Sequence, residues 1–179
     1  MFMHKRLLMA ALGLAGMSGA ALAEDIPQLG RVATPEEMSS WDIDVSPDGT
    51  GLPLGSGTPK QGAAVYAAQC ESCHGVKGVG GPTIRLAGGQ GTIVGSANVR
   101  PIKTIGSYWP YATSVFAYIR RSMPFYDSKS LSNDELYAVT AYLLQINGLI
   151  GDNDVMNAQT LSKVQMPNRD GFFRWKPGD

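Results

Sequence analysis

The chain has 179 residues, a length typical of one domain, and its 15 basic residues balance its 15 acidic ones. This balance, without a basic patch, argues against a nucleic-acid-binding protein. Glycine and proline are frequent, with 22 and 11 residues, and they cluster, which indicates long loops rather than dense secondary structure.

Residues 1–23 have the pattern of a secretory signal peptide. A basic start at Lys5 and Arg6 precedes an apolar run, and a small-residue Ala-Leu-Ala site ends at Ala23. The run is too short and too rich in glycine for a membrane anchor, which needs about 20 apolar residues. We therefore expect cleavage after Ala23 and a periplasmic mature chain without a membrane span. That chain has 13 basic residues, since Lys5 and Arg6 are lost from 15, against 15 acidic ones, a net charge of −2.

Residues 24–57 and 148–179 are polar, rich in glycine and proline, and lack helical or strand periodicity. Each segment carries one tryptophan, Trp41 or Trp175. Because aromatic and apolar side chains are present, we expect two extended arms that pack along the central domain or a partner, in preference to disordered tails.

A first helix is predicted over "TPKQGAAVYAAQ", at the start of the central domain 58–147. Thr58 is a possible N-cap, and Pro59 suits the opening turn. Gly62 and Tyr66 lie on one side of this helix, where the missing side chain of glycine would let a last helix cross closely.

The segment "AAQCESCHGVKG" (67–78) holds the only two cysteines, Cys70 and Cys73, with His74 directly behind them. Such a pair can be half of a zinc site, a redox dithiol or, with the histidine, a haem attachment site. A zinc site needs four ligands, and the expected mature chain has only three cysteine and histidine side chains. A thioredoxin-like dithiol belongs in a βαβ setting that the flanking sequence lacks. We therefore predict one covalent haem c, with a chance disulfide or redox pair as the remaining alternative.

In haem attachment the two thiols add to the porphyrin vinyl groups, and the next residue is held under the iron. His74 is thus the expected proximal ligand.

Residues 75–111 are expected to be loops that wrap the haem, with room for one helical turn, because glycines are frequent and prolines recur. The stretch "GGQGTIVG" (88–95) lacks the strand and helix that flank a nucleotide-binding loop. We interpret it as part of the haem-lining loop.

Two further helices are predicted. An amphipathic segment over about 112–121 ends before Pro124, which prevents helix continuation. Ser132 or Asn133 caps the next helix, whose first turn is acidic and whose apolar spacing continues to about Gly148.

The second axial ligand is sought among methionines, because His74 is the only histidine of the expected mature chain. Met123 has the best context, since it lies on a proline-containing loop between two helices and such a loop can reach across a haem pocket. A core role for Met123 remains open, and Met166, also followed by proline, is the main competitor. Met38 and Met156 have weaker contexts. Met/His ligation raises the reduction potential of a haem.

Three motifs together resemble the class I mono-haem cytochromes c: "CESCHG", the pair Gly81-Pro82, and "RRSMPF" before the last helix. Longer stretches are similar to the cytochrome subunits of bacterial sulfite and sulfur dehydrogenases, and they include both arms: "WDIDVSPDGTGLPLGSGT", "GSYWPYATSVFAYIRRSMPF", "LYAVTAYLLQINGLIGDNDVMNAQTL" and "KVQMPNRDGF". The resemblance implies an all-α cytochrome c fold, with three to five helices around one covalently bound haem and extended terminal arms.

For the haem, the resemblance implies thioether bonds from Cys70 and Cys73, with His74 as the proximal and Met123 as the distal iron ligand. It also implies that the Pro82 carbonyl accepts a hydrogen bond from the other ring nitrogen of His74.

Four residues are weaker predictions. Tyr108 and Trp109 resemble aromatic positions near the haem propionates, with ordinary aromatic packing as an equal alternative. Arg85 and Arg100 are candidates to neutralise the propionates, although exposed arginines are usually only solvated.

A six-coordinate His/Met haem has no open position for a substrate, and no nucleophile–base pair is recognisable. We therefore expect an electron carrier without a catalytic site of its own. The resemblance implies that the protein is the haem subunit that accepts electrons from a molybdenum sulfite or related sulfur-compound dehydrogenase. A downstream cytochrome or a terminal oxidase would be the acceptor. The alternatives are a free shuttle to a terminal oxidase and, from another class, a haem enzyme or gas sensor with an exchangeable distal ligand.

Overall fold

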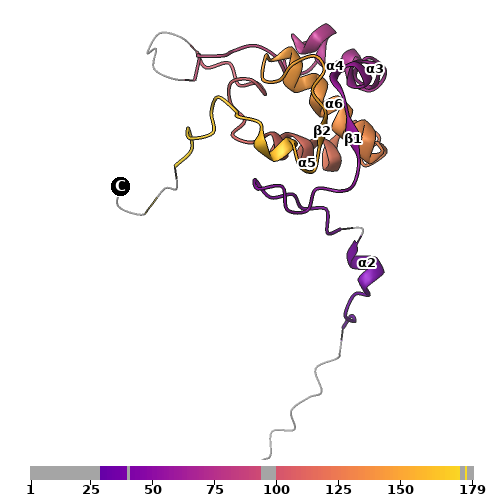
Figure 1. The fold of residues 1–179 in the computed structure, drawn as a ribbon. Helices are drawn as coiled ribbons and strands as arrows, with labels where there is room; N and C mark the ends of the chain where they lie inside the picture. The colour runs from indigo at the N-terminus through magenta and orange to yellow at the C-terminus, as the bar shows by residue number, and fades with distance from the viewer. Residues whose placement is uncertain (1–28, 40, 94–99, 174–175, 177–179) are drawn as a thin grey trace, which may run out of the picture. The chain divides into compact units, whose positions relative to one another are not determined.

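Regular structure in this chain is mostly helical, as the sequence predicts. The computed structural model describes residues 29–39, 41–93, 100–173 and 176, which fall into two units, 1–37 and 38–179 (Figure 1). In the described residues the elements are α2 (Pro35–Ser39), β1 (Ser56–Gly57), α3 (Pro59–Gln69), α4 (Glu71–His74), η1 (Val76–Gly78), α5 (Ala112–Ser122), α6 (Asn133–Ile146), β2 (Met156–Asn157) and η2 (Leu161–Lys163). The predicted signal peptide and Trp175 lie outside the described residues.

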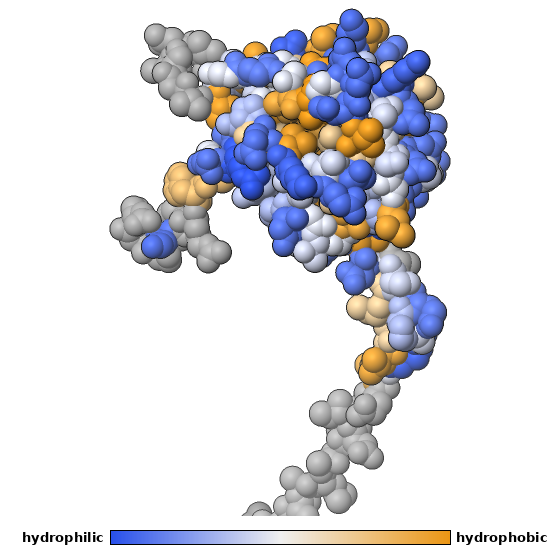
Figure 2. All heavy atoms as spheres, in the orientation of Figure 1, coloured by the Kyte–Doolittle hydropathy of each residue, from blue (hydrophilic) through white to orange (hydrophobic). Residues whose placement is uncertain are grey.

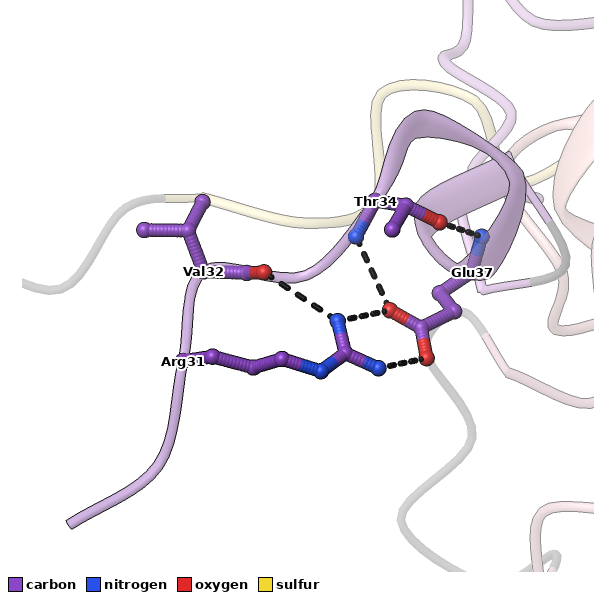
Figure 3. Close-up of polar contacts among 4 residues, drawn as sticks. All are labelled: Arg31, Val32, Thr34 and Glu37. Atoms are coloured by element: carbon purple, nitrogen blue, oxygen red, sulfur yellow. Dashed lines mark hydrogen bonds and ion pairs between the residues drawn. The ribbon is translucent and has the colours of Figure 1, made fainter.

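Helix α2 is ordered by local polar contacts rather than by a core, since none of its residues is buried. The Thr34 hydroxyl accepts from the backbone N–H of Glu37 at 3.3 Å, and the Glu37 carboxylate accepts from the N–H of Thr34 at 2.9 Å (Figure 3). Arg31 donates to both carboxylate oxygens, at 2.8 and 2.5 Å. This ion pair lowers the pKa of Glu37 and raises that of Arg31. The result is a capping box reinforced by one exposed arginine.

Helix α3 begins as predicted. The Thr58 hydroxyl accepts from the N–H of Gln61 at 3.3 Å, and the Gln61 side-chain oxygen accepts from the N–H of Thr58 at 2.9 Å. The predicted close crossing with the last helix is also confirmed, because α3 packs against α6 and a Cβ atom on Gly62 would overlap the carbonyl oxygen of Ala138. Figure 1 shows these two helices side by side.

Helices α5 and α6 lie within one or two residues of their predicted bounds. Ser132, rather than Asn133, is the N-cap of α6: its hydroxyl accepts from the N–H of Glu135 at 3.3 Å, and the Glu135 carboxylate accepts from the N–H of Ser132 at 2.8 Å. Those hydrogen bonds lower the pKa of Glu135. At the other end Gly148 has a φ of +70°, a left-handed conformation that suits glycine after a helix.

The apolar core of the second unit lies between these helices. The rings of Phe116 and Tyr137 are 4.7 Å apart, and those of Tyr66 and Tyr142 are 5.1 Å apart. The C-terminal arm contributes further buried apolar side chains to this core: Met156, Leu161, Val164 and Met166.

The N-terminal arm contacts the helices through polar groups. The Tyr137 hydroxyl donates to the Pro53 carbonyl at 2.8 Å, and Asp134 accepts from the N–H of Ser56 at 2.8 Å. Arg121 forms an ion pair with Asp44. The two arms also pair with each other, with Ser56 opposite Asn157 in the antiparallel sheet. Over these residues both arms therefore pack on α5 and α6.

Among the described residues, no helix has the length and apolarity needed to cross a membrane. Figure 2 shows apolar side chains gathered on one face within a largely polar surface.

Candidate haem site

A cavity of about 590 Å³ opens beside α4, between the loop 83–86 and the helices α5 and α6. Cys70, Cys73, His74 and Met123, the four residues predicted to bind the haem, all line it. Much of the remaining wall is apolar and comes from two helices and the loop before them: Ile105, Val115, Ile119, Val139 and Leu143. A cavity of this volume with few polar groups is typical of a site for a large, mainly apolar ligand.

The turn between α3 and α4 presents the two cysteines and the histidine together. Cys70 ends α3, with its N–H donating to the Tyr66 carbonyl at 2.9 Å, and its own carbonyl accepts from the N–H of His74 at 3.0 Å. The Tyr66 hydroxyl donates to the carbonyl of Gly75 at 2.7 Å, which ties α3 to the residue after the motif. Burial raises the pKa of Tyr66 to about 12, so this hydroxyl remains a donor at neutral pH.

The environment of Cys70 is unlike that of a redox dithiol. Burial, and secondarily the charge of Cys73, raises the pKa of the Cys70 thiol to about 11. Redox and nucleophilic cysteines have lowered pKa values instead, because the thiolate is the reactive form. Nor does the described part of the chain contain a group of three or more His, Cys, Asp and Glu side chains placed to hold a metal ion, as a zinc site would require.

The ring of His74 is oriented by the segment that follows the Gly81-Pro82 pair. Its Nδ1 lies 2.8 Å from the carbonyl oxygen of Ile84 and 3.1 Å from the hydroxyl of Thr83. A carbonyl oxygen only accepts, so Nδ1 carries the proton and Nε2 keeps the lone pair that a metal needs.

This arrangement corrects the prediction for Pro82, which is exposed and does not line the cavity. Gly81 donates its N–H to the Thr83 carbonyl at 3.3 Å, and Thr83 donates its N–H to the Cys73 carbonyl at 3.0 Å. The chain therefore turns at Pro82, and the carbonyl that reaches the imidazole is that of Ile84.

Of the methionines that the structure describes, Met123 is the one that lines the cavity. It lies directly after α5, and its N–H donates to the Ile119 carbonyl at 3.0 Å. Met156 and Met166 are each 4% exposed and belong to the apolar core, whereas Met38 is 54% exposed on α2. This placement supports Met123 over Met166 as the distal ligand.

Of the two aromatic residues predicted near the propionates, only Trp109 lines the cavity. Its ring is edge-to-face with that of Tyr118 at 5.6 Å. Tyr108 does not line the cavity; its ring packs against Phe172 at 5.3 Å and lies beneath the ammonium group of Lys103 at 4.8 Å. Tyr108 therefore has the alternative role, that of ordinary aromatic packing.

The cations that line the cavity are Arg85 and Lys103, while Arg100 is exposed and outside its wall. The Arg85 guanidinium donates to the Val79 carbonyl at 3.2 and 3.3 Å. Sequence reasoning missed Lys103, because a single lysine in a loop has no pattern that separates it from a solvated one.

The interpretation of 88–95 as a haem-lining loop is wrong for its described residues, 88–93, none of which lines the cavity. Gly88 donates its N–H to the side-chain oxygen of Asn147 at 3.1 Å, and Gln90 donates to the Asn147 carbonyl at 3.1 Å. The buried Asn147 thus holds this loop against the end of α6, and the loop stays outside the cavity wall.

Two comparisons agree with this geometry. The family model for subunit III of cbb3-type cytochrome c oxidase matches residues 57–143. A chain in the crystal structure of the sulfane dehydrogenase SoxCD from Paracoccus pantotrophus is 47% identical, with a TM-score of 0.76. The match covers 86% of this chain and 73% of that one. The chain belongs to the cytochrome c family. No curated protein matches it significantly.

As a cytochrome c, the protein holds a haem and transfers electrons, and its mostly helical fold is that of the family. The cavity fits the group. Its apolar wall brings together an imidazole nitrogen with a free lone pair and a thioether sulfur, the pair that ligates iron in cytochromes c, and two thiols that can bond a haem covalently. Arg85 and Lys103 are cations that can meet its carboxylates.

Proposed function

We propose that this cytochrome c is a periplasmic, single-haem electron carrier, and that its electron donor is a molybdenum-containing dehydrogenase of sulfite or a related sulfur compound. The observation that carries the proposal is the 47% identity to a SoxCD chain over 86% of the present chain, a coverage that extends beyond the domain 58–147 into the arms. SoxCD is a sulfane dehydrogenase, which supports a donor that oxidises a sulfur compound. That the donor contains molybdenum is implied by the resemblance of the sequence to the cytochrome subunits of bacterial sulfite and sulfur dehydrogenases.

The residues of the cavity wall have defined tasks in this proposal. Cys70 and Cys73 would hold the haem covalently, each thiol adding across one vinyl group and giving its proton to the neighbouring carbon. His74 Nε2 and the Met123 sulfur would ligate the iron. The bound haem supplies a one-electron Fe(III)/Fe(II) couple.

Closed His/Met ligation supports electron transfer rather than catalysis. With the iron ligated by both side chains, the protein would offer no site at which a sulfur substrate could bind it, so oxidation of that substrate would belong to the partner. Oxidation of sulfite releases two electrons, and this chain accepts them one at a time.

Isolation of a native complex tests the donor. The tagged protein, expressed in its own host and purified at low ionic strength, should bring down a molybdenum-containing subunit in a fixed ratio, measured by metal analysis and mass spectrometry. The complex should reduce its own haem on addition of sulfite or a sulfane-sulfur compound, and the cytochrome alone should not.

The alternatives predict other outcomes. A persistently monomeric cytochrome, reduced by no sulfur compound in the presence of periplasmic extract, would support the free shuttle to a terminal oxidase. Rapid binding of carbon monoxide by the reduced protein would support a haem enzyme or gas sensor. The mass of the purified chain should equal that of residues 24–179 plus one covalent haem.

A further inference from the structure

The imidazole of His74 faces two oxygens at the same ring nitrogen. The Ile84 carbonyl lies 2.8 Å from Nδ1, and the Thr83 hydroxyl lies 3.1 Å from it. Because the carbonyl has no proton to give, the contact to Ile84 requires a proton on Nδ1. That single proton is therefore shared between two acceptors.

The direction of the Thr83 hydroxyl follows from its other contact. Its oxygen lies 3.0 Å from the carbonyl of Cys73, an acceptor to which the hydroxyl donates its only proton. The lone pairs of that oxygen are thus left for the Nδ1 proton, and donation to the Cys73 carbonyl strengthens them as acceptors. The backbone N–H of Thr83 donates to the same carbonyl at 3.0 Å, which fixes the residue beside the ring.

We propose that Thr83 is a positioning residue that lowers the reduction potential of the haem iron by accepting the Nδ1 proton of His74. The proposal rests on the proposed function, in that His74 is taken as an iron ligand. An acceptor at the outer nitrogen of a ligating histidine fixes its tautomer and raises its basicity. A more basic imidazole stabilises the ferric state more than the ferrous state, so each acceptor at Nδ1 makes the potential less positive.

A redox titration of the full-length holoprotein tests the proposal. In Thr83→Val the shape of the side chain is kept and the hydroxyl is lost. We expect the equilibrium constant for reduction to rise roughly three- to tenfold, where tenfold is a positive shift of about 59 mV for a one-electron couple. Thr83→Ala, which also lacks the hydroxyl, should shift in the same direction. Thr83→Ser should keep the midpoint of the wild type, and so should Thr50→Val, a matched change on the exposed arm.

Three results would overturn the role of Thr83. One is an unchanged midpoint in Thr83→Val with a wild-type absorption spectrum. The second is an equal shift in Thr83→Ser, which would indicate packing rather than the hydroxyl. The third is loss of haem uptake in both Thr83→Val and Thr83→Ala with normal Thr83→Ser, which would assign the residue to folding.

An error in the proposed function would be seen in other measurements than an error in the role of Thr83. The titration uses the purified cytochrome, and of the proposed assignments it requires only that His74 ligates the iron. The comparison of Thr83 variants therefore stays valid even if the electron donor or the distal methionine has been assigned wrongly. If His74→Ala kept the absorption spectrum of the wild type, the assignment of the proximal ligand would be wrong, whatever the Thr83 variants show.

Discussion

Four methionines in the described residues differ in their surroundings, and the difference separates Met123 from the others. Its side chain lines the cavity with Cys70, Cys73 and His74, whereas Met156 and Met166 are enclosed by the apolar core. We expect Met123→Ala to lower the reduction potential and to abolish the methionine-to-iron charge-transfer absorption, because a thioether ligand favours the ferrous state. Optical spectra and a redox titration measure both effects.

Met166→Ala is the matched control. It should keep that absorption band and instead lower the free energy of unfolding by about 2–5 kcal/mol, the usual cost of removing a large buried apolar side chain. If the band disappeared in Met166→Ala and survived in Met123→Ala, the distal ligand would be Met166.

A site residue could be predicted from the sequence where its position is determined by its near neighbours in the chain. Cys70, Cys73 and His74 are recognised because one helical turn places all three, and that turn is encoded by their own spacing. The partner of His74 was predicted as Pro82 and is Ile84, because the reach of a carbonyl depends on how the turn after Gly81 closes onto Cys73. No short-range pattern in the sequence reports that closure.

At the scale of elements, the crossing of α3 and α6 depends on one missing side chain. A Cβ atom on Gly62 would overlap the backbone of Ala138, which cannot rotate away as a side chain can. Gly62→Ala gains helix propensity of about 1 kcal/mol. The overlap should outweigh this gain and leave a net loss of about 1–3 kcal/mol. Thermal or urea unfolding of the holoprotein measures the change.

Gly151→Ala provides the comparison, since a Cβ atom there would meet nothing closer than Asp154 at 3.6 Å. Equal destabilisation by the two substitutions would contradict the importance of the helix crossing.

The cap of α6 gives a prediction with a defined pH dependence. Ser132→Ala removes the acceptor for the N–H of Glu135 and should cost about 1 kcal/mol at neutral pH. Hydrogen bonds from the Ser132 hydroxyl and backbone lower the pKa of Glu135 below its ordinary value of 4.5. A lowered pKa in the folded state means stability that is present above pH 4.5 and is lost as the pH falls through the folded value.

Urea unfolding at neutral pH and at about pH 3 measures the difference in free energy of unfolding between the wild type and Ser132→Ala. This difference should be smaller at the lower pH, as the Glu135 carboxylate becomes protonated. Ser130→Ala, on the exposed loop before the helix, should leave stability unchanged at both. A difference that grew on acidification would contradict the proposed hydrogen bonds.

Element bounds were predictable because capping is local. Thr58, Ser132 and Gly148 mark the ends of α3 and α6 through contacts within a few residues. The loop 88–93 was assigned wrongly to the cavity because Asn147, which holds it elsewhere, lies far along the chain, at 59 positions from Gly88.

At the scale of the whole molecule, the two arms differ in what they contribute. Among the described residues after 155, four apolar side chains are buried: Met156, Leu161, Val164 and Met166. At about 1.5–3 kcal/mol each, their burial is worth roughly 6–12 kcal/mol, comparable with the stability of an entire domain. Deletion of residues 156–179 should therefore prevent stable folding, seen as loss of cooperative unfolding and of haem retention.

Deletion of residues 24–37 removes the described part of the first unit and none of the buried core of the second. The unfolding midpoint and haem spectrum should stay unchanged. Equal damage from the two deletions would contradict this division of roles.

The pairing of β1 with β2 bears on the order in which the protein is assembled. Ser56 lies opposite Asn157, so a ladder of two residues joins positions about 100 residues apart. A chain that crosses a membrane from its N-terminus delivers β1 long before its partner strand exists outside. In a chain exported as proposed, Cys70 and Cys73 would emerge during that interval, before Met156 and Asn157 are available to pair with β1. We expect thioether formation to occur on this open chain, with the joining of the arms as the last event of maturation.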